Sequence, residues 1–141
     1  MFGSSFEKRV KDLAGRAGLK IADIKSSRAK LLFTVNDHTQ PLWIFPYEGV
    51  WEFSCPSIIA LPRAEDIPSA ILIAVLEQNA REKRGFWCLE RINGEATLEY
   101  MHNMPDNLLT PQEFSNICWG IVREVEALEQ AFRSALYGKV R

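Results

Sequence analysis

Residues 40–55, "QPLWIFPYEGVWEFSC", decide the fold that we expect from this sequence. Two runs within it, residues 40–46 and 50–55, combine aromatic and β-branched side chains, which favour extended strands. Tyr47, Glu48 and Gly49 lie between the runs and fit a three-residue hairpin loop, in which the glycine takes a left-handed conformation. The stretch therefore predicts an antiparallel β-hairpin.

The length of that loop sets the register of the two predicted strands. It places Phe45 opposite Trp51 and Trp43 opposite Phe53, so that four rings share one face of the hairpin. Each ring can bury about 150–250 Å², so we expect this face to form the floor on which helices pack. A ligand or peptide groove lined by the same rings is the alternative. The other face then carries Leu42, Ile44, Val50, Glu52 and Ser54.

Two segments before the hairpin complete the first half of the chain. Phe6, Val10, Leu13 and Ala14 recur at helical spacing until Gly18, which offers a left-handed stop. Residues 30–36, "KLLFTVN", have the composition of a strand and end in a turn-forming cluster. We therefore expect one helix followed by three strands.

Residues 66–84 predict a second helix, with Asp66 and Pro68 at its start and basic residues at its end. Its first turns are apolar on almost every side, whereas a surface helix keeps a polar stripe. In a chain this small, another copy of the same chain is the best cover for the second apolar side. We therefore predict a homodimer whose interface includes Ile71, Leu72, Val75 and Leu76.

Asn93-Gly94 predicts a tight turn between strands at residues 85–92 and 95–103, because a type I′ turn needs positive φ at both central positions. Pairing Ile92 with Glu95 places Trp87 opposite Tyr100 on a face that we expect to be core. The opposite face mixes apolar and charged side chains, which makes it a second candidate contact surface. It carries Phe86, Cys88, Glu90, Ile92, Thr97, Glu99 and Met101.

A long helix is the last predicted element. Thr110, Pro111 and Glu113 give it a cap, an N1 proline and a capping-box acid, and apolar residues follow at helical spacing from Phe114 onward. We expect its opposite face to be solvated; that face includes Arg123, Glu124, Glu126, Glu129, Gln130 and Arg133. Residues 137–141 are expected to fray.

Composition narrows the classes of function. The chain has 141 residues, 47% of them apolar and 25% charged, which is typical of one globular domain, here residues 1–141. Seventeen basic and eighteen acidic side chains give a net charge of −1, so we expect no nucleic-acid partner. The longest apolar run is too short to span a membrane, and the first residues lack a secretory signal. Glu7 and Asp12 also disfavour a transit peptide.

Candidate chemistry is sparse in this sequence. Cys55, Cys88 and Cys118 match no disulfide, metal or redox spacing, and we expect a cytoplasmic protein with no metal or other cofactor. No nucleotide-binding, metalloprotease or nucleophile-elbow motif is present, so we expect no enzymatic activity. The alternative is a small-ligand-binding or catalytic domain with an aromatic pocket. Its rim would be Trp43, Trp51, Trp87, Tyr100 and His102.

The predicted order of elements is α-β-β-β-α-β-β-α, an α+β arrangement with an antiparallel sheet of about five strands. With this order, and with "LTPQEF" (residues 109–114) opening the last helix, nearly the whole chain resembles the type III secretion chaperone-like fold and, within it, YbjN-type domains. The resemblance implies that the first and last helices share one face of the sheet. It also implies homodimers in which the middle helix forms part of the interface.

Secretion chaperones of this fold hold an effector segment extended in apolar grooves, which is what the resemblance implies about function. We therefore expect a non-enzymatic, intracellular protein-binding module, chaperone-like or adaptor-like, with an unidentified client protein. The residues that we expect to contact the client are Leu42, Ile44, Phe86, Cys88 and Met101.

Overall fold

Three α-helices and six β-strands make up residues 5–138, the part of the chain that the computed structural model describes. The helices are α1 (Ser5–Ala17), α2 (Ser69–Arg81) and α3 (Pro111–Gly138). The strands are β1 (Lys20–Lys25), β2 (Arg28–Val35), β3 (His38–Tyr47), β4 (Val50–Leu61), β5 (Phe86–Ile92) and β6 (Glu95–Pro105). The α+β class is confirmed, with six strands in place of about five.

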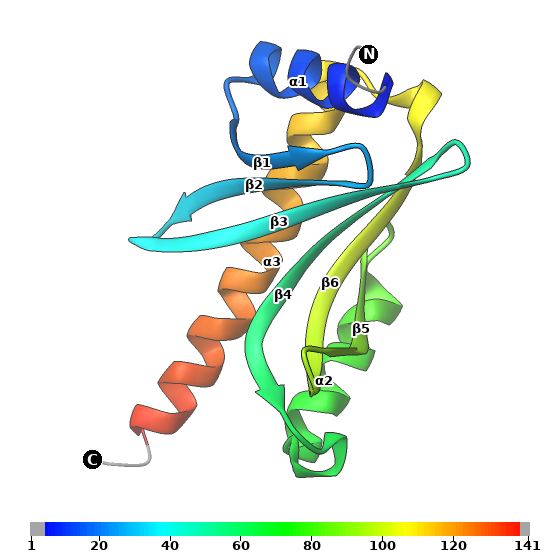
Figure 1. Ribbon diagram of the computed structural model, residues 1–141. Helices are drawn as coiled ribbons and strands as arrows, with labels where there is room; N and C mark the ends of the chain where they lie inside the picture. The colour runs from blue at the N-terminus through cyan, green and yellow to red at the C-terminus, as the bar shows by residue number, and fades with distance from the viewer. Residues whose placement is uncertain (1–4, 139–141) are drawn as a thin grey trace.

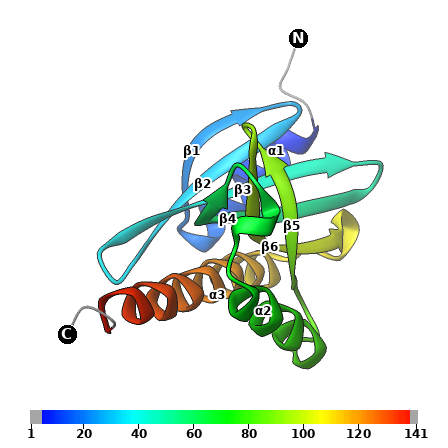
Figure 2. The same cartoon turned by 90° about the horizontal axis from the view of Figure 1, so that it is seen from below.

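The strands form one antiparallel sheet in the order β1-β2-β3-β4-β6-β5. In Figure 1, α3 runs behind the strongly twisted sheet and α1 lies across one end of it. Seen from below in Figure 2, α2 lies on the same side of the sheet as α3, where it packs against β5. Among residues 5–138, all three helices therefore cover one face, and the opposite face has no helix on it.

The register of the β3–β4 hairpin differs by one residue from the predicted one. Tyr47 pairs with Val50, so the turn has only two central residues, Glu48 (φ 30°) and Gly49 (φ 85°). Positive φ at both positions is the signature of the tight primed turns that suit the twist of a hairpin. Because a slip of one residue moves side chains to the other face of a strand, the predicted sharing of one face by four rings is wrong.

In the observed register, Trp51 and Phe53 face the helices together with Leu42 and Ile44. All four side chains are buried. Trp43 and Phe45 point to the opposite face, where they pair with Ser54 and Glu52. The rings of residues 40–55 are thus divided between the core and the helix-free side of the sheet.

The core lies between the helix-covered face of the sheet and the apolar stripes of α1 and α3. Edge-to-face ring pairs join the layers: Phe6 of α1 meets Trp51 with 5.1 Å between centroids, and Phe114 of α3 meets Phe53 at 5.8 Å. Such geometry is the favoured one for aromatic pairs. The predicted cap of α3 is confirmed, because the hydroxyl of Thr110 accepts a hydrogen bond from the N–H of Glu113 at 3.1 Å.

The β5–β6 hairpin has the predicted register. Ile92 pairs with Glu95, Asn93 and Gly94 have φ of 50° and 81°, and the rings of Trp87 and Tyr100 pack with 5.3 Å between centroids. The amide side chain of Asn79 on α2 bonds both the N–H and the carbonyl of Trp87, at 2.6 and 2.9 Å. It therefore satisfies backbone groups on β5, which is an edge strand of the sheet.

Two strands differ from the prediction for local reasons. The sequence pattern misses β1, because a bulge between Ile21 and Asp23 breaks its alternation of buried and exposed side chains. β4 continues past Pro56 to Leu61, with a shift of register between Pro56 and Ala60 that accommodates the proline. Within the predicted frayed tail, Tyr137 and Gly138 belong to α3, and residues 139–141 lie outside the described part of the chain.

Candidate functional site

The helix-free face of the sheet is the candidate site. A row of side chains crosses it from strand to strand: Lys30 on β2 pairs with Trp43, Trp43 with Ser54, Ser54 with Met101, and Met101 with Phe86. Strand residues two positions away from these point to the same side. A sheet face of this kind usually carries polar side chains when water alone covers it, whereas this one is rich in aromatic rings.

The rings of β3 form an ordered stack on this face. Trp43 and Phe45 lie with 6.4 Å between centroids and an angle of 16° between their planes. The cationic groups of Arg28 and Lys30 lie 5.5 and 5.2 Å from the centroid of the Trp43 ring, a cation–π arrangement worth about 0.5–1 kcal/mol at an exposed site. Tyr47, further along the strand, is 57% exposed.

A groove of about 540 Å³ opens beside this stack, between β3, β4 and the tip of the β5–β6 hairpin. We call it the acidic groove, because three carboxyl groups from three different strands line it. Phe45 and Tyr47 contribute to its apolar wall, and Arg28 lies at its β2 side. The three carboxyl groups are those of Glu52, Glu90 and Glu99.

Glu99 is the most enclosed of the three carboxyl groups. It is buried, and none of the ion pairs found within residues 5–138 includes it. Its partners are the Glu90 carboxyl group and the Cys88 thiol, whose Sγ lies 3.6 Å from Oε1. Burial, the hydrogen bond to Glu90 and the charge of that neighbour raise the pKa of Glu99 to about 8. The group is therefore mostly protonated at neutral pH.

Two groups near Glu99, the Glu52 carboxyl and the Cys88 thiol, also have pKa values raised by neighbouring carboxylates. Burial and the charge of Glu90 raise the pKa of Glu52. Burial and the Glu99 carboxylate raise the pKa of the Cys88 thiol to about 12, so it stays protonated at neutral pH and is a poor nucleophile. Its Sγ lies 3.1 Å from Sδ of Met101 on the neighbouring strand.

Of the five expected client-contact residues, three lie on the helix-free face. Phe86 is 37% exposed, Cys88 is half-buried, and Met101 is buried among its neighbours. Leu42 and Ile44 lie in the core beneath α3, because the one-residue difference in register reverses the faces of β3. On β3, Phe45 and Tyr47 lie on the helix-free face instead, and a two-residue Glu-Gly turn was the signal that could have found them. Glu52, Glu90 and Glu99 lie on the faces predicted for them from the sequence.

The structure does not gather the five residues of the alternative aromatic pocket. Trp43 is on the helix-free face, whereas Trp51 is buried against α1. Trp87 and Tyr100 pack on each other in the core, on the side of α2 and α3. His102 is half-buried near α3, where burial and the charge of Arg84 lower its pKa.

The residues expected at a dimer interface lie on α2 with different exposures. Val75 is buried against its own chain and Ile71 and Leu72 are half-buried, whereas Leu76 is 65% exposed. Ile73, on the same helix, is 55% exposed. The helix therefore packs through one side and presents apolar side chains on another.

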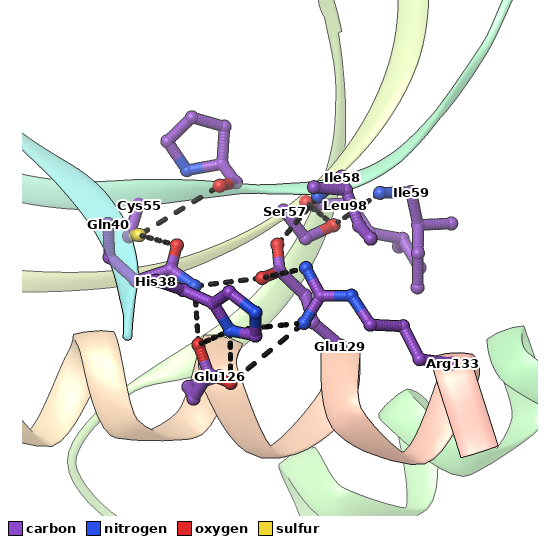
Figure 3. Close-up of polar contacts among 11 residues, drawn as sticks. His38, Gln40, Cys55, Ser57, Ile58, Ile59, Leu98, Glu126, Glu129 and Arg133 are labelled. Atoms are coloured by element: carbon purple, nitrogen blue, oxygen red, sulfur yellow. Dashed lines mark hydrogen bonds and ion pairs between the residues drawn. The ribbon is translucent and has the colours of Figure 1, made fainter. Parts of the chain in front are cut away.

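A second polar cluster lies on the helix-covered side of the sheet, where α3 meets β3 and β4 (Figure 3). Nε2 of Gln40 donates to Glu126 at 3.1 Å and to Glu129 at 2.8 Å, and Glu129 also accepts from the N–H of Ile58 at 2.8 Å. The guanidinium of Arg133 lies 3.9 Å from the Glu126 carboxylate and 3.8 Å from the Glu129 carboxylate. Both glutamates are buried, so the prediction that they are solvated is wrong. Their hydrogen bonds are satisfied, which indicates a structural role.

The sequence matches no protein-family model and no curated protein. No helix within residues 5–138 has the length and apolar composition needed to cross a membrane.

Solved structures nevertheless share its fold. One is the HopA1–SchA chaperone–effector complex, which matches with a TM-score of 0.63 and 10% identity over 89% of this chain and 93% of the other. Another is YbjN from E. coli, with a TM-score of 0.57 and 12% identity over 93% of this chain and 92% of the other. The chain therefore has the type III secretion chaperone-like fold that the order of its predicted elements indicated.

Proposed function

We propose that this chain is a non-enzymatic, chaperone-like protein-binding module that holds a segment of a client protein on the helix-free face of its sheet. The observation that supports this most is the accumulation of aromatic side chains on a face that no helix of residues 5–138 covers. Tyr47 and Phe86 are exposed there, and Tyr47 lines a groove large enough for peptide side chains. One structural neighbour is itself part of a chaperone–effector complex.

The proposal includes a homodimer formed through α2 and a cytoplasmic location. Ile73 and Leu76 leave an apolar strip on a helix that uses its other side for packing within the chain. Apolar strips of this kind are typical of interfaces between protein subunits. Three free cysteines fit the reducing conditions of the cytoplasm.

Capture of partners from the native host tests the client-binding face. We expect the tagged wild-type chain to recover a partner protein in near-stoichiometric amount, and Phe86→Asp to reduce that recovery about tenfold or more, because a carboxylate replaces an apolar contact. Leu108→Asp is the matched control, since Leu108 is an exposed apolar residue outside the sheet. Unchanged recovery with Phe86→Asp, or equal losses with both variants, would contradict the proposal for this face.

A further inference from the structure

The acidic groove has a charge pattern that the rest of the helix-free face does not share. On the β2 side of the ring stack, Arg28 and Lys30 already cover the Trp43 ring. On the other side, along β4, β6 and β5, three carboxyl groups converge, and none of them forms an ion pair within residues 5–138. Two arginines, Arg28 and Arg91, also line the groove. The guanidinium of Arg28 lies over the Trp43 ring and that of Arg91 donates to the carbonyls of Pro62 and Gly94, so within residues 5–138 neither forms an ion pair with the three carboxyl groups.

Converging carboxyl groups repel one another, and the raised pKa of Glu99 reflects this. Besides burial, the hydrogen bond and the charge of Glu90 and the charge of Glu52 raise the pKa of Glu99, and Glu90 also raises the pKa of Glu52. The Cys88 thiol contributes only a weak donor to Glu99. A cation placed among these groups would replace the proton on Glu99 and relieve the repulsion.

The apolar wall of the groove fits the uncharged part of a ligand that carries such a cation. Phe45 and Tyr47 line the groove beside the carboxyl groups, and an aromatic ring attracts a cation above its face. A long methylene stem can pack on the same rings while the charged end reaches the acids. In addition, the buried Nε of Arg28 has no hydrogen-bond partner in the described part of the chain. At this end of the groove it can therefore donate to an acceptor on the ligand, such as a peptide carbonyl.

We propose that the acidic groove receives an arginine or lysine side chain from an extended segment of the client protein. Glu90 and Glu99 bind the charge, and Phe45 supports the aliphatic stem. This inference rests on the proposed function of the same face, and it specifies which client segments fit: those with a basic residue next to apolar ones.

Binding of the cation is coupled to loss of a proton. The charged and titratable groups around Glu99 are Cys88, Glu90 and Arg91 on β5, Glu52 on β4 and Arg28 on β2. With a pKa of about 8 in the empty groove, Glu99 is protonated at pH 7, and it must ionise to bind a cation well. Affinity therefore rises from pH 6 to pH 8 and levels off above the pKa, with release of up to about one proton per peptide near pH 7.

The test uses two acetylated and amidated pentapeptides, Gly-Leu-Arg-Leu-Gly and the same peptide with citrulline in place of arginine. Citrulline has the shape of arginine without its charge. Titrations are followed by the indole N–H resonance of Trp43, and calorimetry in two buffers of different ionisation enthalpy counts released protons. We expect the arginine peptide to bind about tenfold more tightly than the citrulline peptide at pH 8.

Glu99→Gln should remove both the preference for arginine and the pH dependence, and Glu90→Gln, at an exposed position, provides a second variant if the first fails to fold. Glu95→Gln removes an equal charge at the tip of the same hairpin, outside the groove lining, and should change neither. Equal affinity for the two peptides, or an Arg preference that persists in Glu99→Gln and Glu90→Gln, overturns the inference. If the client capture still depends on Phe86 in that case, the proposed function stands without it.

Discussion

At the scale of single residues, the buried glutamates of α3 show how the environment decides the role of a side chain. Glu126 and Glu129 occupy helix positions that look solvent-facing in the sequence, yet both are buried against β3 and β4. A buried carboxylate is tolerated only when hydrogen bonds and charges satisfy it. Gln40, His38 and Arg133 supply them here, with Nδ1 of His38 3.0 Å from Oε2 of Glu126.

These contacts predict a dependence of stability on pH. Burial alone would raise the pKa of Glu126, but hydrogen bonds from His38 and Gln40 outweigh it and leave the pKa below its ordinary value of 4.5. A carboxyl group whose pKa is lowered by folding stabilises the folded state above its unfolded pKa, and this contribution disappears as the pH falls through the folded pKa. The effect of Glu126 is therefore present at pH 7 and lost in acid.

Glu126→Gln should lower the free energy of unfolding at pH 7 by about 1–3 kcal/mol, because the charge-assisted bonds are lost. It should also make the loss of stability as the pH falls below 4.5, the ordinary carboxyl pKa, shallower than in the wild type. Urea unfolding at several pH values measures both effects. Glu95→Gln provides the same change of charge at an exposed site. Parallel pH profiles for wild type and Glu126→Gln would show that the cluster has no such role.

At the scale of elements, two of the hairpins, β3–β4 and β5–β6, can be compared directly. Both have two-residue turns with positive φ at each central position, but β5–β6 uses Asn93-Gly94 and β3–β4 uses Glu48-Gly49. Asparagine tolerates the left-handed region better than glutamate, whose longer side chain offers no local hydrogen bond of the same kind. The Asn-Gly turn was therefore recognisable from the sequence, and the Glu-Gly turn was not.

Glu48→Asn should stabilise the protein by about 0.5–1 kcal/mol, because it relieves a strained backbone position without changing the register. Asn93→Glu, the reverse change in the other hairpin, should destabilise it by a similar amount. Thermal unfolding of the two variants beside the wild type is the measurement. A decrease in stability for Glu48→Asn would indicate that the Glu48 side chain makes a favourable contact that outweighs its backbone strain.

At the scale of the whole molecule, the helices divide the sheet into a covered face and a free face, and this division separates the proposed client site from the proposed dimer interface. The acidic groove lies on the free face, whereas Ile73 and Leu76 lie on α2, on the covered side. Two copies that meet through α2 can therefore each keep a groove open to a client. Self-association and client binding are expected to be independent of one another.

Leu76→Asp tests the dimer. Placing a carboxylate in the exposed apolar strip of α2 should raise the dissociation constant of the dimer at least about tenfold, because the charge would be buried without a partner. Sedimentation velocity at micromolar concentrations measures this, and Leu108→Asp is again the control for an exposed apolar residue elsewhere. A wild-type chain that sediments as a monomer would refute the dimer, and a dimer unaffected by Leu76→Asp would place its interface elsewhere.

The sequence by itself determined the features that depend on neighbouring residues. Asn93-Gly94 specified a hairpin and its register, and Thr110 with Glu113 specified the start of α3, because turn and cap geometry involve only a few consecutive residues. The predicted order of helices and strands was sufficient to recognise the fold. The bulged strand β1 was missed because its irregularity removes the periodicity on which such predictions depend.

Tertiary structure decided which of these side chains meet in the candidate site. A difference of one residue in the β3–β4 turn exchanged Leu42 and Ile44 for Trp43 and Phe45 on the free face, since a strand alternates its side chains with a period of two. The pairing of β4 with β6 brought Glu52 into one groove with Glu90 and Glu99, which are about forty residues away along the chain. No local pattern specifies such a meeting, because the free energy that selects it comes from burying the core on the other side of the sheet.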